Sequence, residues 1–108
     1  IDFRFQEYIN NWIANKFQPK TFDRVAFAGG VKSLDTILGQ IEIAERLHHI
    51  KKIILINHED CGAYGESGTA KKHTEDLRNA TAKIQQLYPD LEVQTYYLYL
   101  NGTFEKIS

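Results

Sequence analysis

The chain has 108 residues, of which 43% are hydrophobic and 25% are charged, and its formal net charge is −1. A nearly neutral chain of this length predicts one globular domain and excludes the strongly basic surface that nucleic-acid binding favours. No apolar run approaches the roughly 18 residues needed to cross a bilayer, so we expect no membrane partner. The single cysteine, Cys61, cannot form an intrachain disulfide and is typical of a reducing compartment, which predicts a cytoplasmic protein.

The first part of the chain predicts a helix, a short strand and a turn. Apolar residues at helical spacing form one stripe, and the helix should end near Lys16, ahead of Pro19. The segment Phe22–Ala28 is rich in β-favouring residues and runs into Gly29–Gly30, which predicts a buried strand followed by a tight turn. The stripe of the helix comprises Phe5, Tyr8, Ile9, Trp12, Ile13 and Phe17.

Helices and strands alternate in the rest of the chain. Ser33 is a suitable N-cap for a second helix, and the continuous apolar run Lys52–Asn57 predicts a strand that is buried on both faces of a sheet. A third helix should span Ala70–Tyr88, where Pro89 stops it. A strand rich in Val, Thr and Tyr should span Glu92–Leu100.

The end of the chain completes the predicted fold. Asn101–Gly102 is a strong hairpin signal, after which residues 103–107 should return as an antiparallel edge strand. Alternation of helices and strands predicts an α/β fold with a mostly parallel β-sheet flanked by helices in three layers. No repeat or linker interrupts this order, so we expect residues 1–108 to form a single domain.

The loop after the strand Lys52–Asn57 carries the strongest chemical signal. Ligands of open α/β sheets bind at the carboxyl ends of strands, and this loop places His58 and Cys61 three residues apart. An imidazole nitrogen and a thiolate are preferred zinc ligands, but zinc needs a third or fourth ligand. The pair alone therefore also fits a buried, packed Cys with a His that caps the loop. A third interpretation is a thiol enzyme in which His58 activates Cys61 as a nucleophile.

Other polar residues have a chemical and a plainer interpretation. Arg4 could clamp the carboxylate of Asp2, or the two could form an exposed terminal pair. Gly29–Gly30 resembles a phosphate-binding turn but lacks the full glycine fingerprint, which favours a tight connection. We expect surface positions for three histidines and packing against the sheet or an interface for three tyrosines. These residues are His48, His49 and His73, and Tyr96, Tyr97 and Tyr99.

Together these motifs resemble those of the β-class carbonic anhydrases. That family carries Cys-x-Asp-x-Arg at the end of its first strand, then an Ala-Gly-Gly turn and a helix, and then a buried strand that ends in His-x-x-Cys-Gly-Ala. Here Ile1–Arg4 matches the last four positions of the first motif, Ala28–Gly30 matches the turn, and His58–Ala63 matches the second motif. Tyr97–Phe104 resembles the final strand and turn of the family, so the resemblance covers essentially the whole chain.

The resemblance implies zinc-dependent reversible hydration of carbon dioxide to bicarbonate. His58 and Cys61 would be zinc ligands. Asp2 would either be a further zinc ligand or pair with Arg4 and leave the zinc open to water. In the second case, Asp2 and Arg4 would be the catalytic pair that orients the attacking hydroxide. The glycines implied in binding bicarbonate are Gly29, Gly30 and Gly62.

Three departures from the family pattern accompany the resemblance. The first Cys of the family would stand just before Ile1, outside this chain. The strand that carries this Cys is missing as well. In the family, that strand lies between the counterparts of Phe22–Ala28 and Lys52–Asn57. We therefore expect the sequence to start inside the motif. In the second departure, Ala26–Phe27 replaces an Arg-Asn pair of the family. In the third, the N-terminal helices that contact a partner subunit in the family are missing. The resemblance still implies a homodimer or higher homo-oligomer. The alternative is a non-enzymatic relative with a structural or regulatory role.

Overall fold

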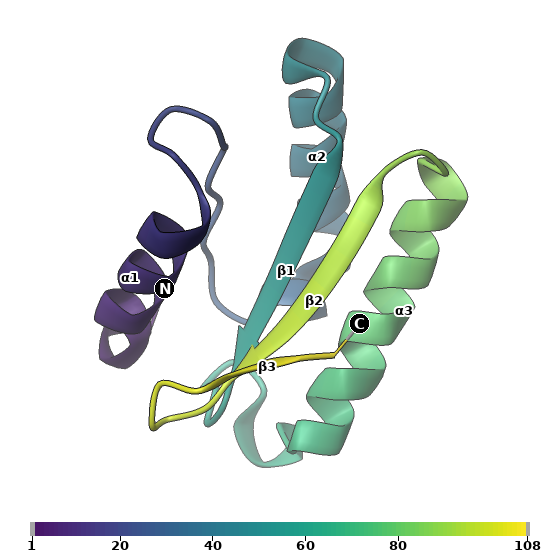
Figure 1. Cartoon of the computed structure of the whole chain (residues 1–108). Helices are drawn as coiled ribbons and strands as arrows, with labels where there is room; N and C mark the ends of the chain where they lie inside the picture. The colour runs from purple at the N-terminus through teal and green to yellow at the C-terminus, as the bar shows by residue number, and fades with distance from the viewer. Residues whose placement is uncertain (1, 108) are drawn as a thin grey trace.

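The computed structural model describes residues 2–107, which form three helices and three strands joined by loops and short 3-10 turns (Figure 1). The α/β class predicted from the sequence is confirmed. Within residues 2–107, no helix is both long and apolar enough to cross a membrane. Ile1, which belongs to the first matched motif, lies outside the described residues. The elements are α1 (Gln6–Lys16), α2 (Leu34–His48), β1 (Lys52–His58), α3 (Ala70–Leu87), β2 (Glu92–Leu98) and β3 (Phe104–Lys106).

The sheet has the strand order β1-β2-β3, with one parallel and one antiparallel pairing. β1 and β2 run parallel from the pair Lys52 and Glu92 to the pair His58 and Leu98, and α3 connects them. Gly102, with a φ of +90°, lies in the tight turn that returns β3 alongside β2. The predicted antiparallel edge strand is therefore confirmed, and the small sheet is mixed, with its parallel pairing between β1 and β2.

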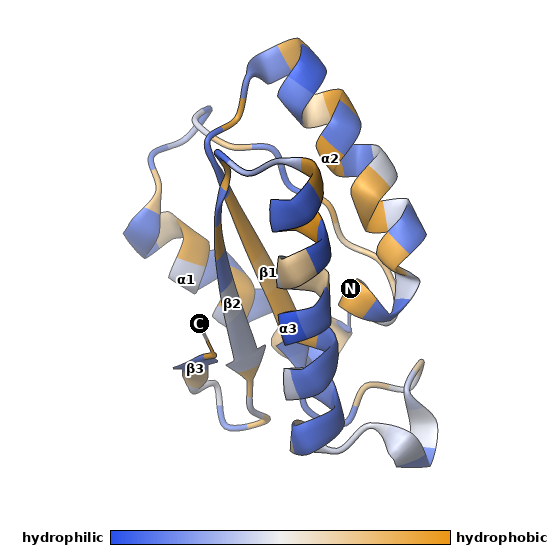
Figure 2. Ribbon diagram, turned by 90° about the vertical axis from the view of Figure 1, so that its right-hand side faces the viewer, coloured by the Kyte–Doolittle hydropathy of each residue, from blue (hydrophilic) through white to orange (hydrophobic). Residues whose placement is uncertain are grey.

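Helices cover both faces of the sheet, which gives three layers. α2 and α3 pack on one face, where they share a core with alternate residues of β1 and β2. α1 lies on the other face, where the ring of Trp12 contacts the rings of Tyr96 and Phe104 with centroid distances of 4.9 Å. Figure 2 shows that β1 is largely apolar and that the outer side of α3 is hydrophilic. The buried core residues are Val31, Ile41, Ile53, Leu55, Leu77, Ala80, Ile84, Leu91 and Val93.

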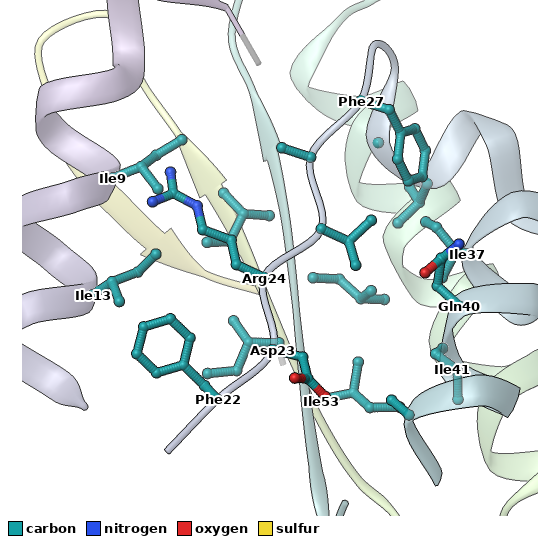
Figure 3. A pocket seen from close by; sticks show the side chains of 18 of the residues that line it. Ile9, Ile13, Phe22, Asp23, Arg24, Phe27, Ile37, Gln40, Ile41 and Ile53 are labelled. Carbon is teal, nitrogen blue, oxygen red and sulfur yellow. The ribbon is translucent and has the colours of Figure 1, made fainter. Parts of the chain in front are cut away.

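The strand predicted for Phe22–Ala28 is wrong, because this segment belongs to no strand. A strand needs a neighbour for its backbone N–H and C=O groups, and no backbone hydrogen bond joins this segment to β1. The segment instead runs between α1 and α2 (Figure 3), and two of its side chains contact polar groups of these helices. Arg24 donates to the side chain of Asn10 in α1 at 2.7 Å, and Asp23 lies 2.7 Å from Nδ1 of His48 in α2. The segment was predicted to be buried, but most of its residues are exposed.

Two finer predictions about these elements are also corrected. β1 is not buried on both faces: Ile53 and Leu55 are buried, but Ile54 and Ile56 on the opposite face are only half-buried. Ile54 and Ile56 line a cavity, and among residues 2–107 no strand pairs with β1 on the side away from β2. Ser33 directly precedes α2, as predicted for an N-cap, but its side chain makes no capping hydrogen bond. A 3-10 turn over Gly30–Ser33 leads into the helix instead.

Candidate metal centre

His58 is the last residue of β1, and its imidazole is held in one orientation. Nδ1 lies 2.9 Å from the main-chain oxygen of Glu59, and the ring of the fully buried Phe5 packs on the imidazole with a centroid distance of 4.4 Å. A carbonyl oxygen can only accept, so the hydrogen bond assigns the proton to Nδ1 and leaves the lone pair on Nε2. A ring N–H that donates to a main-chain oxygen is typical of metal-binding histidines.

Cys61 follows in the loop after β1, where its thiol is buried and free. The main-chain N–H groups of Tyr64 and Gly65 donate to the Cys61 carbonyl oxygen at 3.0 and 3.3 Å, so the loop turns tightly at this residue. His58 and Cys61 line the same cavity as the Gly29–Gly30 turn. The structure therefore brings four of the residues selected from the sequence to one place.

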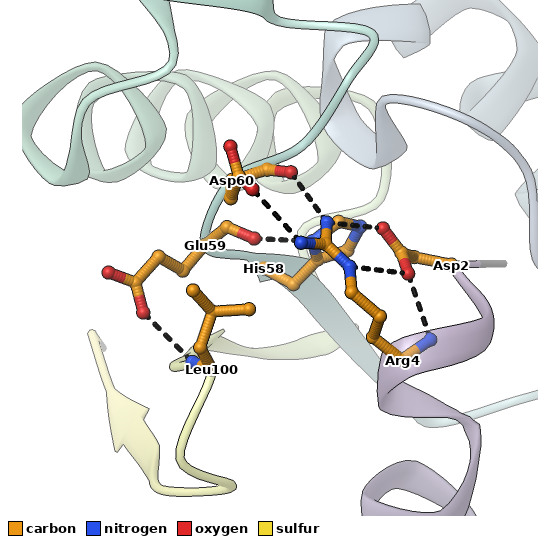
Figure 4. Close-up of polar contacts among 6 residues, drawn as sticks. All are labelled: Asp2, Arg4, His58, Glu59, Asp60 and Leu100. Atoms are coloured by element: carbon orange, nitrogen blue, oxygen red, sulfur yellow. Dashed lines mark hydrogen bonds and ion pairs between the residues drawn. The ribbon is translucent and has the colours of Figure 1, made fainter.

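Asp2 and Arg4 form a close ion pair beside this loop (Figure 4). Nε of Arg4 donates to Oδ1 of Asp2 at 3.1 Å, and Nη2 donates to Oδ2 at 2.7 Å, so the guanidinium binds both carboxylate oxygens. These hydrogen bonds hold the pKa of Asp2 well below its usual range and raise the pKa of Arg4. Arg4 also reaches Asp60, a partner that the sequence analysis missed. The Asp2 carboxylate is therefore ionised and turned toward Arg4.

The residues in this region fit zinc in their chemistry but do not complete a zinc site. The free Nε2 of His58 and the thiol of Cys61 are donors that zinc prefers. Across residues 2–107, no three His, Cys, Asp or Glu side chains are grouped closely enough to hold a metal ion. Asp2, the further ligand that the sequence suggested, is bound to Arg4. The described residues therefore offer two candidate ligands, fewer than the three or four that zinc requires.

The Gly29–Gly30 turn packs against the end of β1. Gly29 and Gly30 have φ angles of +85° and +51°, and a Cβ at Gly30 would lie 2.3 Å from Oδ1 of Asn57. That oxygen accepts a hydrogen bond from the main-chain N–H of Val31 at 3.2 Å. Backbone conformation and close approach therefore both require glycine at position 30. Gly62 differs, because it is exposed and a Cβ there would meet nothing within 4 Å.

The comparison with known families agrees with this set of motifs. Residues 1–108 match the family described as "Putative carbonic anhydrase". The chain belongs to this family. An uncharacterized protein of Rickettsia bellii (strain RML369-C) is 32% identical over 126 residues, which cover 99% of this chain and 77% of that protein. An uncharacterized protein of Rickettsia conorii (strain ATCC VR-613 / Malish 7) is 29% identical over 126 residues, which cover 99% of this chain and 68% of that protein. No solved structure matches the chain.

This member of the carbonic anhydrase family also contains a buried polar network beside the candidate site. The surface position predicted for His73 is wrong, because its side chain is 0% exposed on the inner side of α3. Oδ1 of Asn57 accepts from the main chain, so its Nδ2 donates to Nδ1 of His73 at 2.9 Å and to the hydroxyl of Tyr64 at 3.1 Å. Tyr64 in turn donates to Asp76 at 2.8 Å. The predicted surface positions of His48 and His49 and the predicted packing of Tyr96, Tyr97 and Tyr99 are confirmed.

The burial of His73 predicts a pH-dependent stability for this carbonic anhydrase-family chain. Burial lowers the pKa of His73 from its ordinary value of 6.5. Below that pH the unfolded chain binds a proton at this side chain that the folded chain does not bind, so the free energy of unfolding falls as the pH falls. The contribution is at most about 1.4 kcal/mol per pH unit, and it ends once the lowered pKa is passed.

We expect His73→Phe to remove this part of the pH dependence. Urea denaturation between pH 7.5 and pH 5 measures it, and His49→Asn, which changes an exposed histidine with a φ of +51°, is the matched control. Equal slopes for wild type and His73→Phe would contradict the assignment.

Proposed function

We propose that this chain catalyses the zinc-dependent, reversible hydration of carbon dioxide to bicarbonate. The observation that carries the proposal is the state of His58. Its Nδ1 proton is engaged by the main-chain oxygen of Glu59, and the ring lines the same cavity as the buried, free thiol of Cys61. An imidazole in this tautomer and a thiol are suitable zinc donors. Membership of the carbonic anhydrase family supports the same reaction.

Each residue of the candidate site has a role in this proposal. His58 and Cys61 would hold zinc, which supplies, when bound, a water with its pKa lowered to about 7. Asp2 would accept a hydrogen bond from the hydroxyl group that attacks carbon dioxide and would orient that group. Arg4 keeps the Asp2 carboxylate ionised and fixes its two oxygens. The main-chain groups proposed to bind bicarbonate are those of Gly29, Gly30 and Gly62.

We also propose that a further strand completes the single domain and lies in the cavity beside β1. The cavity has a volume of about 850 Å³ and is lined by side chains of α1, the segment 22–28, α2 and β1 (Figure 3). A parallel strand at the free edge of β1 would end near Asp60, which Arg4 contacts, and would lead directly into Asp2. In the β-class carbonic anhydrases that this chain resembles, this strand ends with the Cys that supplies the third zinc ligand.

The test combines zinc content with a direct rate measurement. Purified full-length polypeptide, with any residues that precede Ile1, is analysed for metal by atomic emission and for carbon dioxide hydration by stopped flow. We expect stoichiometric zinc and a hydration rate well above that of buffer. Absence of both zinc and a Cys before Ile1 would overturn the proposal, and so would bound zinc without hydration above buffer.

Asp2→Asn and Arg4→Ala should separate catalysis from metal binding. Because Asp2 acts on the attacking group and Arg4 acts through Asp2, we expect turnover to fall by about 10-fold to 100-fold, the range typical of groups that orient a metal site. Zinc content should stay at the wild-type level. Asp35→Asn, which removes an exposed carboxylate at the start of α2, should change neither quantity. Loss of zinc in Asp2→Asn or Arg4→Ala would contradict this division of roles.

A second candidate function is a non-enzymatic role in which any bound zinc is structural or regulatory. It is favoured by the finding that the side chains of residues 2–107 bring no three candidate ligands together. Zinc that is closed by protein ligands and does not bind small anions would support this role. The thiol-enzyme alternative predicts instead that alkylation of Cys61 abolishes an activity of the zinc-free protein. We also propose that the protein is located in the cytoplasm and assembles as a homodimer or higher homo-oligomer.

A further inference from the structure

Arg4 has a second partner besides Asp2, and this partner lies in the loop between the two proposed zinc ligands. Nη1 of Arg4 donates to Oδ2 of Asp60 at 2.9 Å, and Nη2 donates to the main-chain oxygen of Asp60 at 3.0 Å. Figure 4 shows the guanidinium between Asp2 and Asp60. One rigid, planar group therefore makes two hydrogen bonds to each of these residues.

The position of Asp60 is not explained by packing. Its side chain is 70% exposed, so burial does not hold it in place. Its backbone has a φ of +56°, in the left-handed region that Asp and Asn adopt more readily than most residues. In this conformation both the carboxylate and the carbonyl oxygen of Asp60 bind Arg4. The local structure of the loop is therefore coupled to the guanidinium.

We propose that Asp60 is a positioning residue that anchors Arg4 to the loop of His58 and Cys61 and, through Arg4, fixes the carboxylate of Asp2 relative to that loop. Asp2 and Arg4 are two residues apart, so without an outside partner they can move together as a pair. Asp60, 56 positions from Arg4, gives the pair a polar tie to the loop. The inference rests on the proposed function because Asp2 matters for catalysis only if it acts at the zinc.

The decisive variant is Asp60→Asn. Asparagine keeps the size of the side chain and tolerates the left-handed backbone, but it removes the charge that binds Nη1. Glu66→Gln is the matched control, because it removes the same charge from an exposed side chain further along the loop that follows β1. Melting temperatures close to that of wild type show that both variants fold. Asp60→Gly, which also allows a positive φ, is the second variant if Asp60→Asn does not fold.

The first readout does not need zinc. It is the hydrogen-exchange rate of the Nε–H group of Arg4, measured by ¹⁵N NMR on the zinc-free chain and assigned by the loss of its signal in Arg4→Lys. This group donates to Asp2 and not to Asp60, so a residue that merely stabilised the loop would leave its exchange unchanged. We expect several-fold faster exchange in Asp60→Asn and no change in Glu66→Gln. Unchanged exchange in Asp60→Asn would overturn the proposal.

The second readout is the hydration rate of the zinc-loaded protein. We expect kcat to fall in Asp60→Asn at unchanged zinc content, with wild-type values in Glu66→Gln. A kcat equal to that of wild type in Asp60→Asn would overturn the link from Asp60 to catalysis. If wild type itself neither binds zinc nor hydrates carbon dioxide, the proposed function fails, while the exchange of the Arg4 Nε–H group still decides whether Asp60 positions the ion pair.

Discussion

Replacing Cys61 by serine should abolish zinc binding and, with it, the hydration of carbon dioxide. Zinc strongly prefers a thiolate to a hydroxyl group, and Cys61 is the only cysteine among residues 1–108. Groups that merely orient zinc ligands contribute about 10-fold to 100-fold in affinity, and a ligand should contribute more than about 100-fold. Isothermal titration with zinc and stopped-flow hydration measure the two effects.

The structure offers a matched control for this variant in the same loop. Glu66 is exposed, and Glu66→Gln removes a potential metal-binding carboxylate without touching the buried thiol. We expect wild-type zinc affinity and turnover for Glu66→Gln. Equal zinc affinity for wild type and Cys61→Ser would show that Cys61 is a packed core residue and would remove the basis of the proposed function.

Among glycine-to-alanine substitutions near the site, Gly30→Ala should lower the free energy of unfolding the most. The backbone at Gly30 has a φ of +51°, and the new Cβ would lie 2.3 Å from Oδ1 of Asn57. Strain in the left-handed region costs about 1–3 kcal/mol, and loss of the hydrogen bond from Val31 to Asn57 adds about 1 kcal/mol. We expect the free energy of unfolding, measured with urea, to fall by about 2–4 kcal/mol.

Gly39→Ala makes the same chemical change without either penalty. Gly39 lies within α2, and a Cβ there would meet nothing within 4 Å. Alanine is favoured over glycine in a helix by about 0.5–1 kcal/mol, so this variant should be more stable than wild type. If both variants changed stability equally, the close packing of the Gly29–Gly30 turn on Asn57 would be contradicted.

The part of the site that could be predicted from sequence is the part that short motifs encode. His58 and Cys61 are three residues apart and follow an apolar strand, so their meeting at one end of the sheet needs only local structure. The Arg4–Asp2 pair is local in the same way. Asp60 was missed as a partner of Arg4 because the two residues are 56 positions apart in the sequence, and their residue types do not predict the contact.

His73 was missed for a different reason, because its signal was present in the sequence. It precedes Leu77 by four residues and Ala80 by seven, which places it on the buried face of α3 with both. Charged neighbours made the start of this helix look polar. One nitrogen of the buried imidazole, Nδ1, is paired with Asn57 on β1, and that contact depends on the tertiary fold.

The prediction for Phe22–Ala28 was wrong because composition describes what a segment prefers and not what lies beside it. The residues favour a strand, but a strand forms only where a neighbour offers backbone partners. Arg24 and Asp23 instead bind α1 and α2, and the cavity separates the segment from β1.

The free edge of β1 also affects how the chain should behave at high concentration. One side of this strand pairs with β2, and the other is not paired with any strand that the structure describes. An unpaired edge made of Ile53, Ile54, Leu55 and Ile56 is a template for strand pairing between molecules. If the proposed further strand covers this edge, it protects the chain from aggregation as well as completing its sheet. Solubility and activity should accordingly depend on the same stretch of polypeptide.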